Sequence, residues 1–203
     1  MSNRKISRIV SVLLLVAMLA GIMPVGIMEK SFAAEDELIG VKEVVAGGYH
    51  TIFIKNDGTV WATGKNEYGQ LGLGDTKNRN TPTKVDIDNV KEVVAGYEHT
   101  IFLKNDGTVW ATGRNDYGQL GLGDENNRYT PTKVDIDNVK EVVAGYFHTI
   151  FLKNDGTVWA TGHNGYGQLG LGDRTNKNTP TKVDIDNVKE VVAGEYHTIF
   201  IKN

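Results

Sequence analysis

The chain has 203 residues, of which 40% are hydrophobic and 23% are charged, and its formal net charge is −3. It contains no cysteine, which excludes disulfide bonds, a lipid-modified cysteine anchor and any thiol-based catalysis or metal site. The anionic balance disfavours nucleic acid as a partner, because affinity for phosphate backbones comes largely from cationic side chains that release counterions.

The N-terminal region has the organisation of a secretory signal peptide. Cationic residues at positions 4, 5 and 8 precede an apolar run over residues 9–23, and small residues follow at Ser31 and Ala33. We therefore predict a signal peptide over residues 1–33 and a short N-terminal segment over residues 34–40. Loss of residues 1–33 removes four cations and one anion, so the net charge changes from −3 to −6.

The alternative for this region is a retained membrane anchor. Pro24 and Gly26 interrupt the apolar run, and no second apolar stretch is long enough to span a bilayer. We therefore predict a secreted protein, extracellular or at the cell surface, with no membrane span after cleavage.

Internal repetition organises the remainder of the chain. His50, His99, His148 and His197 recur every 49 residues, so full units cover residues 41–89, 90–138 and 139–187, and a partial unit covers residues 188–203. A period near 50 with strand-like patterning indicates a propeller or a solenoid, because one small sheet cannot bury its faces without neighbours on both sides.

Each full unit contains four predicted strands. In the first unit they cover residues 41–47, 51–55, 59–63 and 81–85, with the tight-turn sequence Asn-Asp-Gly between the second and third. Pro82 and Lys84 suit an outer edge strand, where a missing N–H costs little and a charge discourages further pairing. This pattern predicts an all-β fold, a β-propeller of four-stranded antiparallel blades with about three and a half blades, as an open arc or part of a larger ring.

Two residue types recur at fixed places in the units and are interpreted as structural. The tryptophans on the third strand, predicted to pack between blades, are Trp61, Trp110 and Trp159. The four repeat histidines are predicted to be structural and hydrogen-bonded. One imidazole per blade gives wide separations and no second ligand at fixed spacing, whereas tetrahedral zinc needs its donors around one ion. We expect no metal and no cofactor.

Three segments of the repeat carry a resemblance to a known family. They are AGxxHT at residues 46–51, DGTVWATG at residues 57–64 and NxYGQLG at residues 66–72, and all three recur in every full unit. They resemble the repeat of the regulator of chromosome condensation family. The resemblance implies a seven-bladed propeller whose faces bind proteins, as in a nuclear nucleotide-exchange factor for a small GTPase and in a secreted bacterial inhibitor of β-lactamase. It also implies a structural role for the repeat histidines.

The differences between the units nominate a binding face. The full units differ only at the places that the first unit fills with residues 48, 49, 54, 65, 67, 76, 77, 79 and 80. All but residue 54 fall in the loops between the first and second and between the third and fourth strands. In an up-and-down sheet these two loops emerge on the same face. The predicted partner-binding residues on this face are Tyr49, Tyr97, Glu98, Tyr146, Phe147, Glu195, Tyr196, Lys65, Arg114 and His163.

The alternative interpretation of these differences is neutral drift in exposed loops. If the face does bind, we expect an extracellular protein as the partner, with cell-wall or cell-surface polysaccharide as the alternative and inhibition of an extracellular enzyme as a third option. Because seven blades of this period need about 340 residues, we also expect either a homo-oligomer or a longer reading frame that completes the ring.

Catalysis is not expected. Serine occurs only at positions 2, 7, 11 and 31, so the predicted mature chain has no serine nucleophile. Asp86 and Asp88 recur in every full unit, which favours a role in a turn, whereas a catalytic pair needs two carboxylates in different environments. We therefore predict a binding protein and not an enzyme.

Overall fold

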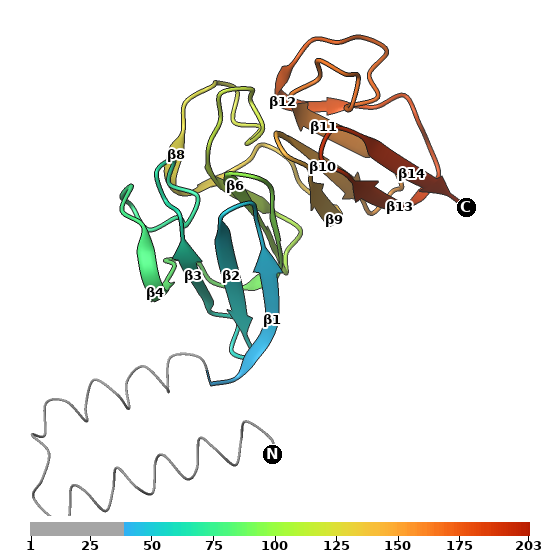
Figure 1. Cartoon of the computed structure of the whole chain (residues 1–203). Helices are drawn as coiled ribbons and strands as arrows, with labels where there is room; N and C mark the ends of the chain where they lie inside the picture. The colour runs from blue at the N-terminus through green and yellow to red at the C-terminus, as the bar shows by residue number, and fades with distance from the viewer. Residues whose placement is uncertain (1–38) are drawn as a thin grey trace, which may run out of the picture. The chain divides into compact units, whose positions relative to one another are not determined.

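The computed structural model of the protein describes residues 39–203 (Figure 1). The predicted signal peptide, residues 1–33, and most of the predicted segment over residues 34–40 lie outside the described residues. Residues 40–203 form one compact unit. None of the described residues belongs to a helix that is long and apolar enough to cross a membrane.

The described chain is all-β and consists of three four-stranded sheets and one two-stranded sheet. The first blade contains β1 (Val41–Ala46), β2 (His50–Lys55), β3 (Val60–Gly64) and β4 (Arg79–Lys84). The second contains β5 (Val90–Ala95), β6 (His99–Lys104), β7 (Val109–Gly113) and β8 (Arg128–Lys133). The third contains β9 (Val139–Ala144), β10 (His148–Lys153), β11 (Val158–Gly162) and β12 (Lys177–Lys182), and the half blade contains β13 (Val188–Ala193) and β14 (Thr198–Lys202).

Within each blade the strands pair antiparallel in chain order, which confirms the predicted propeller blades, about three and a half in number. The outer strand begins earlier than predicted, at Arg79 and not at Thr81. Arg79 is held there because it pairs with Gly64 across a register shift, and its carbonyl accepts a 2.8 Å hydrogen bond from Thr63 Oγ1. The edge strand is therefore anchored by its first residue.

Local chemistry explains the hairpin between the second and third strands. Gly58 has a φ of +79°, a backbone conformation that glycine adopts without steric cost. The Asp57 carboxylate accepts hydrogen bonds of 3.0 Å from the Thr59 N–H and 2.7 Å from the Thr59 hydroxyl. These bonds hold the pKa of Asp57 below its ordinary value. Equivalent bonds recur at Asp106 and Asp155, so every full blade has the same turn.

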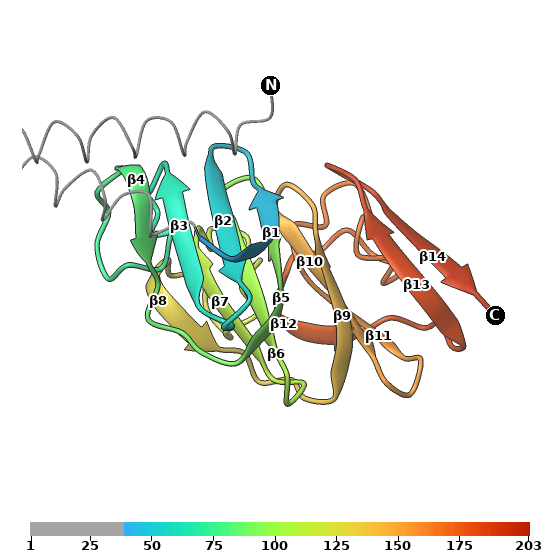
Figure 2. The ribbon, with the colours of Figure 1, turned by 90° about the horizontal axis from the view of Figure 1, so that it is seen from below.

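The hydrophobic core lies between successive blades, which stand side by side in the turned view (Figure 2). One cluster joins Ile52 and Val60 of the first blade to Val93 and Phe102 of the second, and the same arrangement recurs at the next two junctions. Phe102 and Phe151 are completely buried. Trp110 and Trp159 are only partly buried and pack against these clusters from their margins. Each sheet therefore relies on its neighbour to remove its apolar side chains from water.

A hydrogen bond between a histidine and a threonine side chain, which we name the clasp, also joins each blade to the next. The repeat histidines bond through Nε2 to a threonine hydroxyl of the following blade, at 2.8 Å for His50, 3.3 Å for His99 and 3.1 Å for His148. At the first junction the Thr100 hydroxyl donates its single proton to the Gln70 carbonyl at 2.7 Å, so the His50 Nε2 atom must be the donor to Thr100. Burial lowers the pKa values of His50, His99 and His148 to about 4, 3 and 4, and these rings are neutral. His197, in the half blade, is exposed.

Candidate interaction face

The loops between the first and second and between the third and fourth strands emerge together, on what we name the loop face. Because the strands pair in chain order, these two connections lie at the same end of each sheet. Backbone hydrogen bonds tie the two loops of each blade together: Lys65 N–H donates to the Tyr49 carbonyl at 2.9 Å, and His163 N–H donates to the Phe147 carbonyl at 2.8 Å. The variable positions 49 and 65 are therefore neighbours in space, whereas the variable positions 79 and 80 lie in β4 and not in a loop, contrary to the prediction.

A buried asparagine shapes the long loop of each blade. The Asn66 side chain is fully buried, donates to the Asp75 carbonyl at 2.9 Å and accepts from the Leu71 N–H at 2.9 Å. Arg79 bonds the Asp75 carboxylate at 2.7 Å and holds the pKa of Asp75 below its ordinary value. The second and third blades repeat the asparagine bonds at Asn115 and Asn164. The long loop is thus a packed structure that can present side chains in fixed positions.

A row of tyrosines crosses the loop face, one from each blade. The ring centroids are 5.1 Å apart between Tyr49 and Tyr97, 4.3 Å between Tyr97 and Tyr146, and 5.4 Å between Tyr146 and Tyr196, all with edge-to-face geometry. The hydroxyls of Tyr97 and Tyr49 are hydrogen-bonded at 2.8 Å, which raises the pKa of Tyr97 to about 12. These contacts order the rings before any partner arrives.

A second line of rings completes what we name the aromatic network. It runs from Phe147 to Tyr117 at 5.3 Å, to His163 at 4.9 Å, to Tyr166 at 5.8 Å and back to Tyr196 at 5.5 Å. Tyr166 is 72% exposed, Tyr49 55% and Tyr196 40%. An exposed, connected patch of large rings is typical of an interaction surface.

A buried carboxylate lies among these rings. The Glu98 side chain is only 4% exposed and forms ion pairs with Lys65 at 2.7 Å and with Arg114 at 2.9 Å. The same two cations flank the ring of Tyr68, at 5.4 Å and 4.9 Å from its centroid. The pairing raises the pKa of Lys65, chiefly through its hydrogen bond to Glu98. Glu98 therefore orients two cations and presents no free carboxylate to a partner.

The structure brings most of the predicted partner-binding residues into one connected surface. Glu195 is exposed at the edge of this surface, and Lys65 and Arg114 are held by Glu98. Tyr68, Tyr117 and Tyr166 belong to the surface but were not predicted. These three residues are the same in every unit, so a comparison of units cannot reveal them. Each of them directly follows a variable residue, at position 67, 116 or 165, and this could have indicated that they lie on the same surface.

A shallow groove of about 320 Å³ runs across the loop face. Alanine residues at the ends of the innermost strands and the glycines that follow them line the groove, and we name them its floor; Tyr97, Tyr146 and Glu195 also line it, and we name them its sides. No cationic side chain lines it. Within the part of the chain that the structure describes, no group of three or more histidine, aspartate or glutamate side chains could hold a metal ion.

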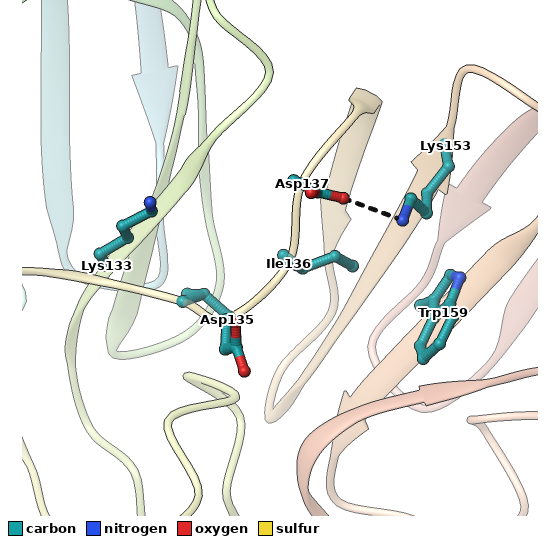
Figure 3. Close-up of a pocket in the computed structure, with 7 residues that line it drawn as sticks. Lys133, Asp135, Ile136, Asp137, Lys153 and Trp159 are labelled. Carbon is teal, nitrogen blue, oxygen red and sulfur yellow. Dashed lines mark hydrogen bonds and ion pairs between the residues drawn. The ribbon is translucent and has the colours of Figure 1, made fainter.

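A second concavity lies at the opposite end of the strands. This pocket of about 390 Å³ is formed by Lys133 at the end of β8, by Asp135, Ile136 and Asp137 of the connection into the third blade, and by Lys153 and Trp159 of that blade (Figure 3). Lys153 forms a 3.2 Å ion pair with Asp137 and lies 5.6 Å from the Trp159 ring centroid.

The repeat matches a known family along most of the chain. The model of the regulator of chromosome condensation (RCC1) repeat matches residues 57–103, 106–152 and 155–201, and a second model of the same repeat matches residues 41–70, 90–119 and 139–168. The chain belongs to the RCC1 repeat family. The human X-linked retinitis pigmentosa GTPase regulator is 54% identical over 41 residues, which is 20% of this chain and 4% of that protein.

Solved structures of yeast RCC1 and of a human protein share the fold. Yeast RCC1 (Prp20) bound to Kap60 superposes with a TM-score of 0.72 at 23% identity, over 80% of this chain and 41% of that one. Prp20p from Saccharomyces cerevisiae, in a structure that also concerns its binding to Gsp1p and histones, gives 0.70 at 24% identity, over 78% and 42%. Human WBSCR16 gives 0.60 at 19% identity, over 82% and 59%. The chain therefore spans less than half the length of the yeast RCC1 structures.

Proposed function

We propose that this RCC1-repeat chain is a secreted, non-catalytic binding protein whose loop face binds an extracellular protein. The observation that supports the proposal is the aromatic network, in which rings from four successive sheets contact one another and remain partly exposed. Tyrosine gives a large contact area with few rotatable bonds, and rings ordered in advance lose little entropy on binding. The ion pairs of Glu98 order Lys65 and Arg114 in the same way.

The chemistry of the loop face supports a non-catalytic role. The repeat histidines His50, His99 and His148 are buried, neutral and hydrogen-bonded to threonines of the next blade, so they are withdrawn from solvent. Serine and cysteine are missing from residues 32–203 of the sequence. Covalent catalysis requires a nucleophile with an adjacent base, and these groups provide no such pair. Prp20p, which shares this fold, has protein partners in Gsp1p and histones.

The test compares the two faces of the protein. The full chain is immobilised, and the proteins released into the medium by the producing cell are passed over it. One variant combines Tyr97→Ala, Tyr146→Ala and Phe147→Ala, and the control variant combines Asp86→Ala and Asp88→Ala on the opposite face. Thermal unfolding confirms that both remain folded. We expect the retained protein to be lost only with the loop-face variant, and equal losses from both would contradict the proposal.

Secretion has a separate test. Expression of the full chain in its own cell, followed by N-terminal sequencing of the protein recovered from the medium, is expected to give a chain that begins at Ala34. Recovery of the uncleaved chain in the membrane fraction would contradict it and would favour a retained anchor.

A second candidate function is binding of cell-wall or cell-surface polysaccharide. Among the described residues, Tyr166 is the most exposed large ring, and the pocket beside Trp159 combines an aromatic side chain with the carboxylates of Asp135 and Asp137. Such combinations suit sugars, which offer both apolar and hydroxyl surfaces. Retention of the full chain on insoluble cell-wall polysaccharide, lost on Tyr166→Ala or Trp159→Ala, would favour this function over protein binding.

A further inference from the structure

Several backbone N–H groups that line the groove of the loop face are already hydrogen-bonded within the protein. The N–H groups of Gly96 and Gly145 donate to the carbonyls of His99 and His148, both at 3.0 Å. The N–H groups of Tyr97 and Tyr146 donate to the next blade, to the carbonyls of Tyr146 and Glu195 at 3.3 Å and 3.1 Å. The backbone along the floor is therefore tied from blade to blade through its N–H groups.

Two backbone carbonyl oxygens of the same floor accept no hydrogen bond from the described residues. Among the described residues, no backbone or side-chain donor bonds the carbonyl oxygens of Gly145 and Gly194. These oxygens lie close to the preceding blade: each would be 2.6 Å from a Cβ atom on the glycine one repeat earlier. Only glycine permits this approach, so these two carbonyl oxygens lie at the junctions between blades, in the backbone that lines the groove.

The sides of the groove add to this negative character. Tyr97 and Tyr146 line it with aromatic rings, whose faces attract cations, and Glu195 contributes an exposed carboxylate. Unlike Glu98, Glu195 has no ion pair with any described residue. The lining contains no lysine, arginine or histidine side chain to balance it. The groove thus offers several acceptors, two rings and one anion.

We infer that this groove takes an arginine side chain of the protein partner, an inference that rests on the proposed function. A guanidinium group is planar, carries five N–H donors and stacks on aromatic rings, so it can bond carbonyl oxygens and a carboxylate while it contacts a tyrosine. A volume of about 320 Å³ accommodates one such side chain with room for its neighbours. A carboxylate or phosphate would meet the Glu195 carboxylate and no cationic side chain there.

The experiment uses a probe that needs no partner. A capped glycine-arginine-glycine peptide is titrated into the ¹⁵N-labelled full chain, and the amide signals of Tyr97, Tyr146 and Glu195 are followed by NMR. These residues differ in their sequence neighbours from one repeat to the next, so their signals can be distinguished. The comparison peptide carries citrulline, which has the shape of arginine without its charge. We expect the arginine peptide to shift these signals at lower concentration, and added salt to weaken its binding.

Two variants test the groove itself. Glu195→Gln removes its one charge, and Tyr146→Leu removes a ring, and each is expected to weaken arginine-peptide binding about two- to fivefold. Asp135→Asn makes the same charge change on the opposite face and is expected to leave binding unchanged. Equal affinity for the arginine and citrulline peptides, or shifts outside the groove, would overturn the inference. If the partner is nevertheless lost from the loop-face variant, the proposed function stands and only the arginine assignment fails.

Discussion

The Nε2 atom of His50 lies 2.8 Å from the hydroxyl oxygen of Thr100, a residue fifty positions later in the next blade. The Thr100 hydroxyl in turn donates to the Gln70 carbonyl of the first blade, so one threonine links two segments of the preceding unit. The His50 Nδ1 atom has no partner and faces Gly47, where a side chain would overlap the ring. The clasp therefore requires a neutral imidazole with its proton on Nε2.

Loss of a central clasp is expected to destabilise the protein. His99 is completely buried, so His99→Ala removes a hydrogen bond and leaves a cavity, at a cost of about 2–4 kcal/mol in the free energy of unfolding. Urea denaturation measures the change. The matched control is His197→Ala, since His197 occupies the same repeat position but is exposed, and a change within about 0.5 kcal/mol is expected there. Similar losses for both variants would argue against the clasp.

Stability is expected to fall in mild acid. The folded-state pKa values of His50, His99 and His148 are about 4, 3 and 4, whereas an unfolded histidine has its ordinary value of 6.5. Because the folded values are depressed, the unfolded chain binds protons first, and stability that is complete above pH 6.5 is lost as the pH falls towards 4, by about 1 kcal/mol per pH unit and histidine.

Urea denaturation at pH 7.5, 6.5, 5.5 and 4.5 tests this dependence. Most carboxylates remain ionised between pH 7.5 and 5.5, so the histidines dominate the slope there. His99→Gln is expected to flatten the curve by up to about one third of its slope, since His99 is one of three buried histidines with strongly lowered pKa values, and His163, whose pKa burial also lowers, contributes to the remainder. A curve that is flat down to pH 4.5 would mean that the rings are not held neutral.

Glycine at the end of the innermost strand is expected to be irreplaceable. A Cβ atom at Gly145 would overlap the ring of His148 and lie 2.6 Å from the Gly194 carbonyl oxygen. Gly145→Ala must therefore separate two blades and is expected to cost about 2–4 kcal/mol. Gly172→Ala is the control: Gly172 has a φ of +78° but open space around it, so only the backbone conformation opposes alanine, at about 1 kcal/mol. Thermal unfolding of both variants gives the comparison.

The buried carboxylate of the loop face is expected to be structural. Glu98→Ala leaves Lys65 and Arg114 with only their pairs to Glu67 at 3.2 Å and Asp116 at 2.7 Å, and we expect a loss of about 1–3 kcal/mol. The double variant Glu98→Ala with Arg114→Ala is expected to lose less stability than the sum of the two single losses, because fewer charges are then left without their partner. Strictly additive losses in urea denaturation would show that the pair is not coupled.

Much of the blade could be predicted from the sequence because its signals are local. The Asn-Asp-Gly turn and the alternation on either side of it define the hairpin of the second and third strands within one unit. The outer strand was harder, since its start at Arg79 depends on a bond to Thr63, sixteen residues away. Because the units are identical at most positions, a strand predicted in one unit is predicted at the same place in the others.

The candidate site could be predicted only in part, because its geometry forms between units. Lys65, Glu98 and Arg114 were nominated as partner contacts, but their mutual pairing depends on how one blade is rotated against the next. The tyrosines that are identical in every unit, Tyr68, Tyr117 and Tyr166, are not among the predicted partner contacts. Identity between repeats indicates a shared environment, and it does not distinguish a buried environment from an exposed one.

The clasp between His50 and Thr100 has a consequence for how such a chain can lengthen. Every full unit holds both halves of the joint, a histidine on one flank and a threonine on the other. A copy of the unit placed after the original therefore meets a flank that already fits it, with no compensating substitution. Tandem duplication of this gene segment yields a matched junction at once, and selection is left free to act on the variable positions, of which six lie in loops and two, 79 and 80, at the start of the edge strand.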